Sequence, residues 1–310
     1  MTASSQSSVT PIQSSSEPPS VIVPDIDLFA KRALRFEQLA VGHSLGDWLG
    51  FLATLTRAQH QALQTLPVLP LPGTAEREQT HAFRMPLVPA QSWPRDPAWH
   101  GVLHQIIEAV MPAAPQLARD DLTRLSNLPS RQLEVLAERV MRAELAGEDG
   151  ALLPYVGAAL QVVWTALAAR LGRSIGAIDV PGVCPCCGYL PQASVVKTVS
   201  AGDQSVANLR YLHCAMCNTE WNLVRVKCAT CDANDSISYR QLEGPGVTQP
   251  GAVRAETCEH CKTYLKIIYQ EQGGVDPVAD DLATLALDIL VDQAGYARAG
   301  PNLLLVPGLN

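Results

Sequence analysis

The chain has 310 residues, of which 47% are apolar and 17% are charged, and its formal net charge is −7. This length allows two or more domains with a sizeable core, and the composition is that of an ordinary, mildly acidic soluble protein. Residues 1–20 lack the basic cluster and apolar run of a signal peptide, and no apolar stretch reaches the roughly 20 residues that span a bilayer. We therefore expect a cytoplasmic protein without membrane insertion, in a compartment where thiols stay reduced.

The first expected helices follow a polar tail. Residues 1–20 are rich in Ser, Thr, Gln and Pro, so we expect a disordered tail that ends at residue 22. Apolar residues recur at helical spacing from Asp25 to about Gly42. Ser44 and Asp47 then have the spacing of a capping box that opens a second helix. The expected result is a helical hairpin.

The segment from Leu66 to Pro97 carries seven prolines. Because each proline fixes φ and removes a backbone donor, we expect an extended loop that wraps another surface. A third helix should start near Asp96, with Pro97 in its first turn, and run to Met111.

This third helix carries His100, His104 and Glu108 on one face, at positions i, i+4 and i+8. Three such side chains could bind a metal ion. The flanking acid of a hydrolytic zinc helix is absent, however, and partly buried polar stripes are more common than metal sites. A polar stripe is therefore the favoured interpretation.

Two further helices complete an all-helical domain over residues 23–175. The first should run from Ser130 to Leu145 and the second from Pro154 to Leu171, each with an apolar face. A connector that contains several glycines then leads to the cysteine-rich part of the chain.

Eight of the nine cysteines form four Cys-x-x-Cys pairs. The third and fourth pairs lie 44 residues after the first and second, which defines an internal repeat. Two such turns supply four thiolates for one tetrahedral ion, so a tandem grouping gives each repeat its own metal site. A cross-braced grouping, first pair with third and second with fourth, also respects the repeat but ranks behind. The tandem ligand sets are Cys184, Cys187, Cys214 and Cys217 for one ion and Cys228, Cys231, Cys258 and Cys261 for the other.

Each repeat should form a small β-rich module, over residues 181–224 and 225–274. Runs of β-branched and aromatic residues predict strands at 194–199, 221–226 and 264–269. The modules are therefore expected to resemble zinc ribbons or other four-cysteine knuckles.

A metal-binding turn favours a residue that tolerates left-handed φ after its second cysteine. Gly188, Asn218 and Asp232 meet this requirement, whereas Lys262 does not. Three of the four turns therefore have a suitable residue at this position.

Other uses of the cysteines fit the pattern less well. Disulfides are disfavoured, because paired Cys-x-x-Cys turns without a secretion signal favour metal. A thioredoxin-type redox pair would open a helix, which four repeated pairs do not resemble. Cys186 is interpreted as an incidental small residue, with a reactive thiol or a substitute ligand as alternatives. His213 and His260 adjoin ligand cysteines and should support a ligand or face solvent.

Residues 275–310 should hold a last helix and a tail. Asp276 and Pro277 are good N-cap and first-turn residues. The helix should dock on the helical domain or on the second module through Val278, Leu282, Leu285 and Ile289. An extended apolar tail is expected over residues 302–307.

Charge argues against a nucleic-acid-binding ribbon protein. Residues 181–274 contain eight Lys and Arg and eight Asp and Glu. Two tetrathiolate sites with divalent ions would add about −2 each. A nucleic-acid face needs clustered positive charge, which this block lacks.

Several runs occur together in one order: Arg210-Tyr-Leu-His-Cys214, Cys217-Asn-Thr-Glu-Trp221, Val224-Arg-Val-Lys-Cys228, Thr263-Tyr-Leu-Lys-Ile267 and Ala279-Asp-Asp-Leu-Ala283. With them the chain resembles the formate dehydrogenase accessory proteins. The resemblance is close over about residues 180–305 and looser in the helical half.

The resemblance implies a multi-domain α+β chain, with an all-helical N-terminal domain, two tandem rubredoxin-like modules and a C-terminal helix. Each module would hold one iron ion, with zinc as the alternative, since both ions accept four thiolates. The resemblance also implies a cytoplasmic, non-enzymatic chaperone in the maturation of respiratory formate dehydrogenase. Such a protein binds the molybdenum-containing catalytic subunit before twin-arginine export. A rubredoxin-type redox or electron-transfer role on the same enzyme, and a homodimer, stay open.

Overall fold

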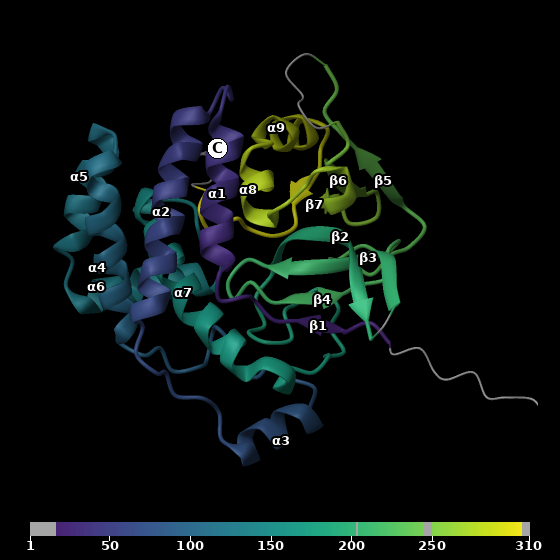
Figure 1. Cartoon of the computed structure of the whole chain (residues 1–310), viewed down its shortest axis with the longest axis horizontal. Helices are drawn as coiled ribbons and strands as arrows, with labels where there is room; N and C mark the ends of the chain where they lie inside the picture. The colour runs from purple at the N-terminus through teal and green to yellow at the C-terminus, as the bar shows by residue number, and fades with distance from the viewer. Residues whose placement is uncertain (1–16, 203, 245–249, 306–310) are drawn as a thin grey trace, which may run out of the picture.

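The computed structural model describes residues 17–202, 204–244 and 250–305. A lobe of helices lies beside a β-sheet, and two short C-terminal helices lie next to both (Figure 1). This arrangement confirms the predicted α+β class, with a helical N-terminal region, two four-cysteine clusters and C-terminal helices. The domain boundaries given above stay predictions.

Seven α-helices form the helical lobe within the described residues. The first two form the expected helical hairpin, and α4 starts at the expected proline-rich boundary. Among the seven, α5 has no counterpart in the sequence analysis, because its short polar sequence has only two buried residues. The helices are α1 (Leu28–Ala40), α2 (Gly46–Thr65), α3 (Thr74–Ala82), α4 (Ala98–Val110), α5 (Gln116–Ser126), α6 (Ser130–Met141) and α7 (Leu153–Leu171).

Helix α7 lies at the centre of the lobe, in contact with α2, α4 and α6. Of its 19 residues, 16 are buried, and a helix that is apolar all round is a core helix. The segment 150–174 is long and apolar enough to cross a membrane by composition, but 89% of its apolar window is buried inside the protein. Its hydropathy is therefore explained by packing.

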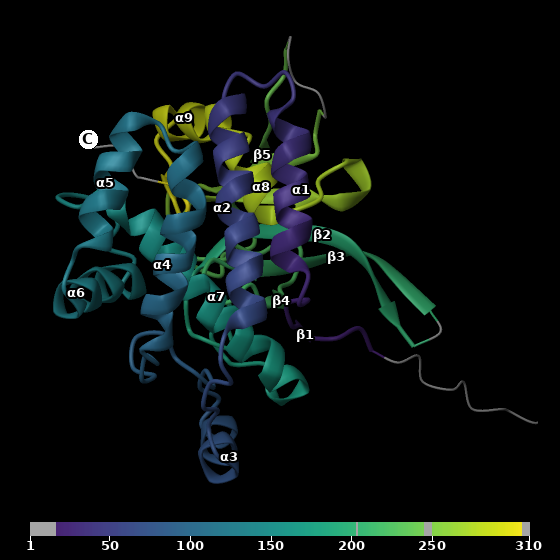
Figure 2. The ribbon, with the colours of Figure 1, turned by 60° about the vertical axis from the view of Figure 1, so that its left-hand side comes forward.

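Two predictions about local structure in this lobe are wrong. Helix α2 starts at Gly46 with Leu45 at the N-cap position and without a side-chain cap, so the predicted capping box of Ser44 and Asp47 does not form. The proline-rich segment is not wholly extended, since α3 forms in its middle. There the Glu76 carboxylate accepts from the backbone N–H of Gly73 at 2.7 Å and caps the helix. Figure 2 shows α3 projecting from the body.

One sheet joins both cysteine repeats, in the order β1-β4-β3-β2-β7-β6-β5. The neighbouring strands are antiparallel, except that β2 and β7 pair in parallel and β8 adds to β7 in parallel. Strands β2, β3 and β4 belong to the first repeat, and β5, β6 and β7 occupy the corresponding places in the second. The strands are β1 (Val21–Ile22), β2 (Pro191–Ala201), β3 (Gln204–Cys214), β4 (Glu220–Asn222), β5 (Ile237–Arg240), β6 (Val253–Cys258), β7 (Thr263–Tyr269) and β8 (Ala297–Arg298).

The end of the predicted disordered tail is ordered. Val21 and Ile22 form β1 on the free edge of β4, and the backbone carbonyl of Ser20 accepts from Asn222 at 2.9 Å. An exposed strand edge offers unpaired backbone groups, which explains why this polar segment is held. The rest of the predicted tail, residues 1–16, lies outside the described residues.

The C-terminal part departs from the single predicted helix. It forms α8 (Pro277–Leu282), which packs on α1, β2 and β7, and α9 (Leu285–Gln293), which packs on β6 and β8. Ile289 is 59% exposed and does not dock, because the break between α8 and α9 turns it outward. Residues 302–305 form a turn rather than an extended tail, with Leu303 and Leu304 buried. Residues 306 and 307 lie outside the described residues.

A buried set of ion pairs, the Lys266 cluster, fastens this C-terminal part to the sheet. It consists of Lys266 on β7, Asp281 on α8, Asp288 on α9 and Arg298 on β8. The Asp281 carboxylate lies 3.1 Å from Lys266 Nζ and 2.6 Å from Arg298 Nη2, and Asp288 pairs with both cations. Two positive and two negative side chains balance, which is what lets charges be buried.

Replacing Asp281 should strongly destabilise the fold. In Asp281→Ala, the buried Lys266 and Arg298 share only Asp288, so we expect a loss of about 3–5 kcal/mol in the free energy of unfolding. Glu37→Ala is the control, because Glu37 pairs with Arg57 on the surface, where such pairs contribute about 0–1 kcal/mol. Denaturant titration of both variants measures the difference, and equal losses would contradict the assigned role.

The same variant should alter the acid sensitivity of the protein. Burial raises the pKa of Asp281, but Arg298 and Lys266 outweigh it and lower the pKa below its ordinary value. A carboxylate whose pKa is lowered by folding stabilises the folded protein at pH values above its pKa in the unfolded chain. This stabilisation is lost as the pH falls through its pKa in the folded protein. Wild-type protein should therefore lose stability below about pH 4, and Asp281→Ala should lose less.

Candidate metal centres

The first four-cysteine cluster is built by two turns of the first repeat. Cys184 and Cys187 lie in the turn before β2, and Cys214 and Cys217 lie in the turn between β3 and β4. Cys184 Sγ is 3.4 Å from Cys217 Sγ, and Cys187 Sγ is 3.4 Å from Cys214 Sγ. All four sulfurs lie within 4.8 Å of one another.

The second cluster has the same construction. Cys228 Sγ is 3.6 Å from Cys261 Sγ, and Cys231 Sγ is 3.7 Å from Cys258 Sγ. These four sulfurs also lie within 4.8 Å of one another. The structure therefore groups the cysteines in the tandem order and not in the cross-braced order.

The sulfur positions fit a tetrahedral ion. Metal–sulfur bonds of about 2.3 Å give a tetrahedron with edges of about 3.8 Å. The close sulfur–sulfur distances of 3.4 Å in the first cluster and 3.6 and 3.7 Å in the second approach that length. A donor set of four thiols without oxygen suits zinc or iron rather than a hard ion such as calcium.

Each of the four turns reverses the chain through a left-handed residue. The φ angle is +69° at Gly188, +56° at Asn218, +62° at Asp232 and +55° at Lys262. The prediction that Lys262 is unsuited is therefore wrong. Its side chain pairs with Glu259 at 2.6 Å across the turn, which helps to offset the cost of about 1–2 kcal/mol for this conformation.

Two threonines at equivalent repeat positions support the clusters. Thr219 Oγ1 lies 3.2 Å from Cys217 Sγ, and Thr263 Oγ1 lies 3.0 Å from Cys261 Sγ. A hydroxyl group at this distance can donate a hydrogen bond to a thiolate and stabilise its charge. The sequence analysis missed both residues, although the 44-residue spacing between them could have found them.

The helical lobe covers the first cluster. On α7, Gln161 Nε2 donates to the carbonyl of Ala215 at 2.7 Å, and Thr165 Oγ1 accepts from Asn218 Nδ2 at 2.9 Å. Arg32 on α1 donates to Asn218 Oδ1 at 3.0 Å. Asn218 thus links the turn of Cys217 to two helices of the lobe.

The proline-rich segment covers the other turn of this cluster. The backbone N–H of Val88 donates to the carbonyl of Cys186 at 2.9 Å, and that of Ala90 donates to Cys187 at 2.8 Å. The prediction that this segment wraps another surface is therefore correct for residues 88–90. The surface is the first metal-binding turn.

Burial sets the ionisation of the first cluster in the absence of metal. It raises the pKa of the Cys184 and Cys187 thiols well above the ordinary value. Burial also opposes ionisation of Cys217, but hydrogen bonds from neighbouring thiols outweigh it and lower the pKa of Cys217. Since a metal ion binds thiolates, the loading of this cluster must release protons.

The second cluster is less buried, and it also contains one thiol with a lowered pKa. Burial opposes ionisation of Cys258, but backbone N–H groups of Cys261 and His260 and neighbouring thiols lower its pKa to about 7. At neutral pH this thiol is therefore partly ionised without metal. Its sulfur is available as a first ligand for an incoming cation.

The remaining candidate residues stand apart from both clusters. His100 lies 3.1 Å from Glu134 on α6, while His104 and Glu108 are exposed, so the expected polar stripe is present and the described residues form no metal cluster there. His213 is buried and lies 3.1 Å from Asn218 Oδ1, and His260 is exposed.

Cys186, the ninth cysteine, is fully buried beside the first cluster but does not belong to its group of four sulfurs. Its position inside the first turn brings its backbone carbonyl to Val88. The interpretation of Cys186 as an incidental small residue stays a prediction.

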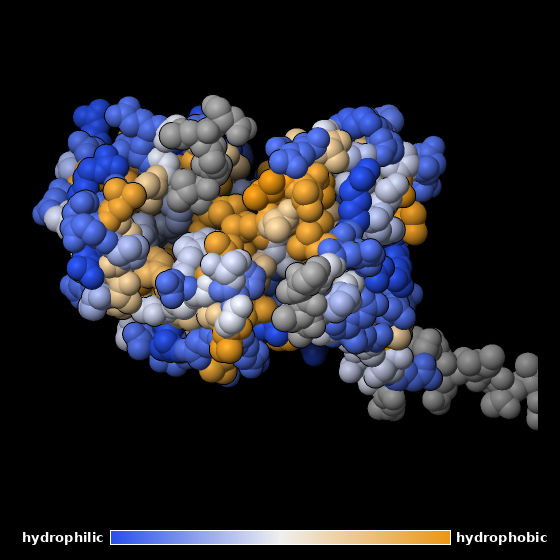
Figure 3. Space-filling model, turned by 90° about the horizontal axis from the view of Figure 1, so that it is seen from above, coloured by the Kyte–Doolittle hydropathy of each residue, from blue (hydrophilic) through white to orange (hydrophobic). Residues whose placement is uncertain are grey.

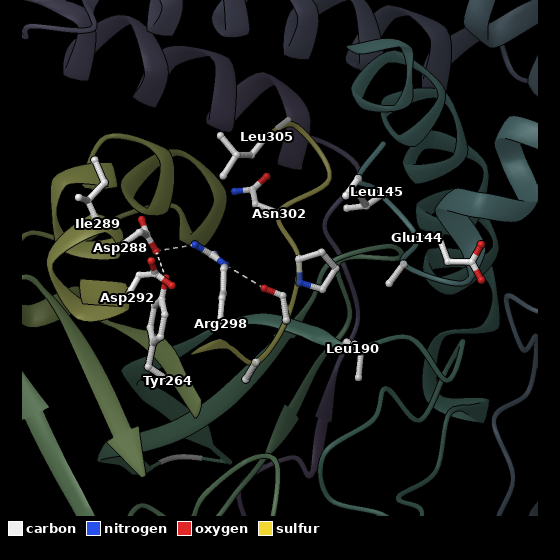
Figure 4. Close-up of a pocket in the computed structure, with 15 residues that line it drawn as sticks. Glu144, Leu145, Leu190, Tyr264, Asp288, Ile289, Asp292, Arg298, Asn302 and Leu305 are labelled. Atoms are coloured by element: carbon white, nitrogen blue, oxygen red, sulfur yellow. Dashed lines mark hydrogen bonds and ion pairs between the residues drawn. The ribbon is translucent and has the colours of Figure 1, made fainter. Parts of the chain in front are cut away.

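A groove lies between the segment that follows α6 and helix α9. It has a volume of about 790 Å³, and its lining includes Leu145 and Glu144 after α6 and Ile289 and Asp292 on α9, with Arg298 and Asn302 between the two sides (Figure 4). Apolar surface fills the hollow between the two sides (Figure 3). Arg298, the only basic side chain among the lining residues, is already paired in the Lys266 cluster.

Three family models match the chain in order. They are "FdhE, N-terminal" at residues 18–177, "FdhE, central domain" at 183–225 and "FdhE, C-terminal domain" at 226–305. This chain belongs to the FdhE family. The assignment supports an accessory role in formate dehydrogenase maturation and confirms the resemblance given by the sequence motifs.

Individual FdhE proteins match over nearly the whole chain. "Protein FdhE homolog" of Edwardsiella ictaluri is 39% identical, over 93% of this chain and 92% of the relative. "Protein FdhE homolog" of Serratia proteamaculans is 37% identical, over 91% of this chain and 89% of the relative. The crystal structure of the FdhE protein from Pseudomonas aeruginosa matches with a TM-score of 0.84 and 34% sequence identity. The match covers 94% of this chain and 100% of that chain.

The double substitution Cys228→Ser and Cys231→Ser should remove one of two metal ions per chain and unfold the second module. The module is too small to fold on its own core, and metal binding supplies folding energy. Metal analysis and circular dichroism measure both effects. Cys186→Ser is the matched control, because it leaves all eight clustered sulfurs in place, and unchanged metal content in the double variant would contradict the ligand assignment.

Proposed function

We propose that this protein is a cytoplasmic maturation factor for respiratory formate dehydrogenase, which binds the catalytic subunit before export and catalyses no reaction itself. The observation that carries the proposal is the match to FdhE proteins over more than nine-tenths of the chain. Two features of the molecule support a binding role. They are the two thiol clusters, which stabilise the β modules when loaded, and the apolar groove beside α9.

The eight clustered cysteines are proposed to hold two mononuclear iron ions, with zinc as the alternative occupant. When bound, tetrathiolate iron supplies a one-electron redox centre, whereas zinc supplies structure only. The same eight cysteines would bind either ion. The half-buried sulfurs of Cys231 and Cys261 favour a rubredoxin-type redox role as the second candidate function, because electron transfer needs an approachable centre.

Metal analysis of protein purified with and without air tests this assignment. We expect close to two irons per chain in the anaerobic preparation, with charge-transfer absorption bands typical of tetrathiolate iron. Bands that bleach on reduction would support the redox candidate. Two zinc ions per chain and a colourless protein in both preparations would contradict the assignment of iron and leave the clusters a structural role. Fewer than one ion per chain in both preparations would contradict metal binding itself.

The groove is proposed as the docking surface for the catalytic subunit. Apolar surface lies in the hollow (Figure 3), and α9 exposes Ile289 and Leu290 beside it, with 59% and 55% of their surface accessible. Among the described residues, neither Glu144 nor Asp292 on its rim forms an ion pair. A segment of the subunit with apolar and basic side chains would match this surface in shape and charge.

Ile289→Asp should weaken binding of the catalytic subunit by about tenfold or more, because it places a charge where apolar surface should be buried. Folding should be unchanged, since Ile289 is exposed. Val68→Asp is the matched control, because Val68 is 84% exposed and precedes α3, which lies at the opposite end of the molecule from α9 (Figure 2).

Titration of purified catalytic subunit against both variants measures the affinities. Equal affinity of Ile289→Asp and wild-type protein would contradict docking at the groove while leaving the binding function intact. Failure of wild-type protein to bind the subunit at all would contradict the proposed function.

A further inference from the structure

The two four-cysteine clusters have the same internal geometry but different surroundings. Corresponding turns have the same left-handed residue positions and the same threonine beside the last cysteine. A difference in behaviour between the clusters must therefore come from what surrounds them. The repeat thus provides its own internal comparison.

The first cluster is enclosed on every ligand. Its four cysteines have exposed fractions of 0% or 1%, and the residues between the cysteines of each pair, Cys186 and Met216 among them, are buried as well. Helix α7 and residues 88–90 bond directly to the two turns. A reagent can reach these sulfurs only after the turns separate from the helical lobe, which requires breaking core contacts.

The second cluster lies at the surface. Cys231 and Cys261, the second cysteine of each pair, are half-buried, and the neighbouring Thr230, Glu259 and His260 are exposed. In the described part of the chain, the charged side chains at its turns form ion pairs with each other, Lys227 with Asp232 and Lys262 with Glu259, and the Tyr296 hydroxyl donates to Glu259. Among the described residues, no hydrogen bond joins these turns to α7 or to residues 88–90.

We propose that the second cluster is the exchange site of this protein, at which a thiophilic cation enters and leaves, whereas the first cluster keeps its ion as a permanent part of the fold. Exchange proceeds through Cys231 and Cys261, because an incoming soft ligand can approach the ion from the side of these two sulfurs. The ion passes to the incoming ligand, and the freed thiolates take protons from water. The inference rests on the proposed binding of one ion by each cluster.

Zinc release from the full-length chain tests the proposal. Protein loaded with two zinc ions is mixed with the chromogenic chelator 4-(2-pyridylazo)resorcinol, and release is followed by absorption. We expect two phases of one ion each, separated by at least about tenfold in rate, because release of the slow ion requires local opening of the helical lobe. Two ions released in a single phase would overturn the inference.

Pulsed alkylation locates the two phases without any substitution. After the fast phase, N-ethylmaleimide should label Cys228, Cys231, Cys258 and Cys261 in mass spectra of peptide digests, and leave the four cysteines of the first cluster unlabelled. Equal labelling of both clusters, or earlier labelling of the first, would overturn the assignment.

A substitution provides the second check. Cys231→Ser with Cys261→Ser should abolish the fast phase and leave the slow phase within about twofold of wild type, since the first cluster and its cover are unchanged. Loss of the slow phase instead would overturn the proposal. A wild-type chain that cannot be loaded with zinc at all would overturn the metal-binding function itself, which distinguishes that failure from failure of the exchange assignment.

Discussion

The packing of the first cysteine cluster against α7 is the constraint on which the rest of the structure depends. The amide of Asn218 links that cluster to Thr165 on α7 and to Arg32 on α1. Arg32 in turn bonds to Asp276 at 3.0 Å, which caps α8. One left-handed turn residue therefore holds the helical lobe, the first module and the C-terminal helices in register. A metal ion at this cluster would stabilise contacts beyond the first module. The turn cannot open without breaking its bonds to the helical lobe and, through Arg32, the link to the C-terminal helices.

The duplicated module explains how two centres with one geometry can have different roles. The parallel pairing of β2 with β7 places the repeats side by side in a single sheet, so the helical lobe can cover only one of them. The four cysteines of the first repeat are buried under the lobe, while Cys231 and Cys261 of the second repeat are half-buried. With one cluster buried and the other at the surface, the first can contribute to the stability of the fold while the second stays open to reaction with external ligands.

Patterns with strict spacing predicted the structure well. The 44-residue repeat predicted the tandem grouping of all eight cysteines, apolar periodicity predicted α1, α2, α6 and α7, and Pro97 in a first turn predicted α4. Local composition misled where tertiary contacts decide. Lys262 adopts left-handed φ because the metal-type turn dictates the backbone, and β1 forms because β4 offers a free edge. The cover of the first cluster by residues 88–90 depends on contacts between segments about 100 residues apart, which no local pattern encodes.

The location of the groove connects this asymmetry to partner binding. Its lining combines residues that follow α6 with residues of α9, β8 and the C-terminal turn, so it exists only when the helical lobe and the C-terminal part are assembled. The Lys266 cluster holds α9 and β8 at that position, and Arg298 contributes to both the cluster and the groove wall. A partner that fills the groove therefore favours the assembled arrangement over any opened one, by an amount set by its concentration relative to its dissociation constant. If the proposed partner binds at the groove and the first cluster holds an ion, both would oppose the same opening, so the two binding events would reinforce each other by linkage.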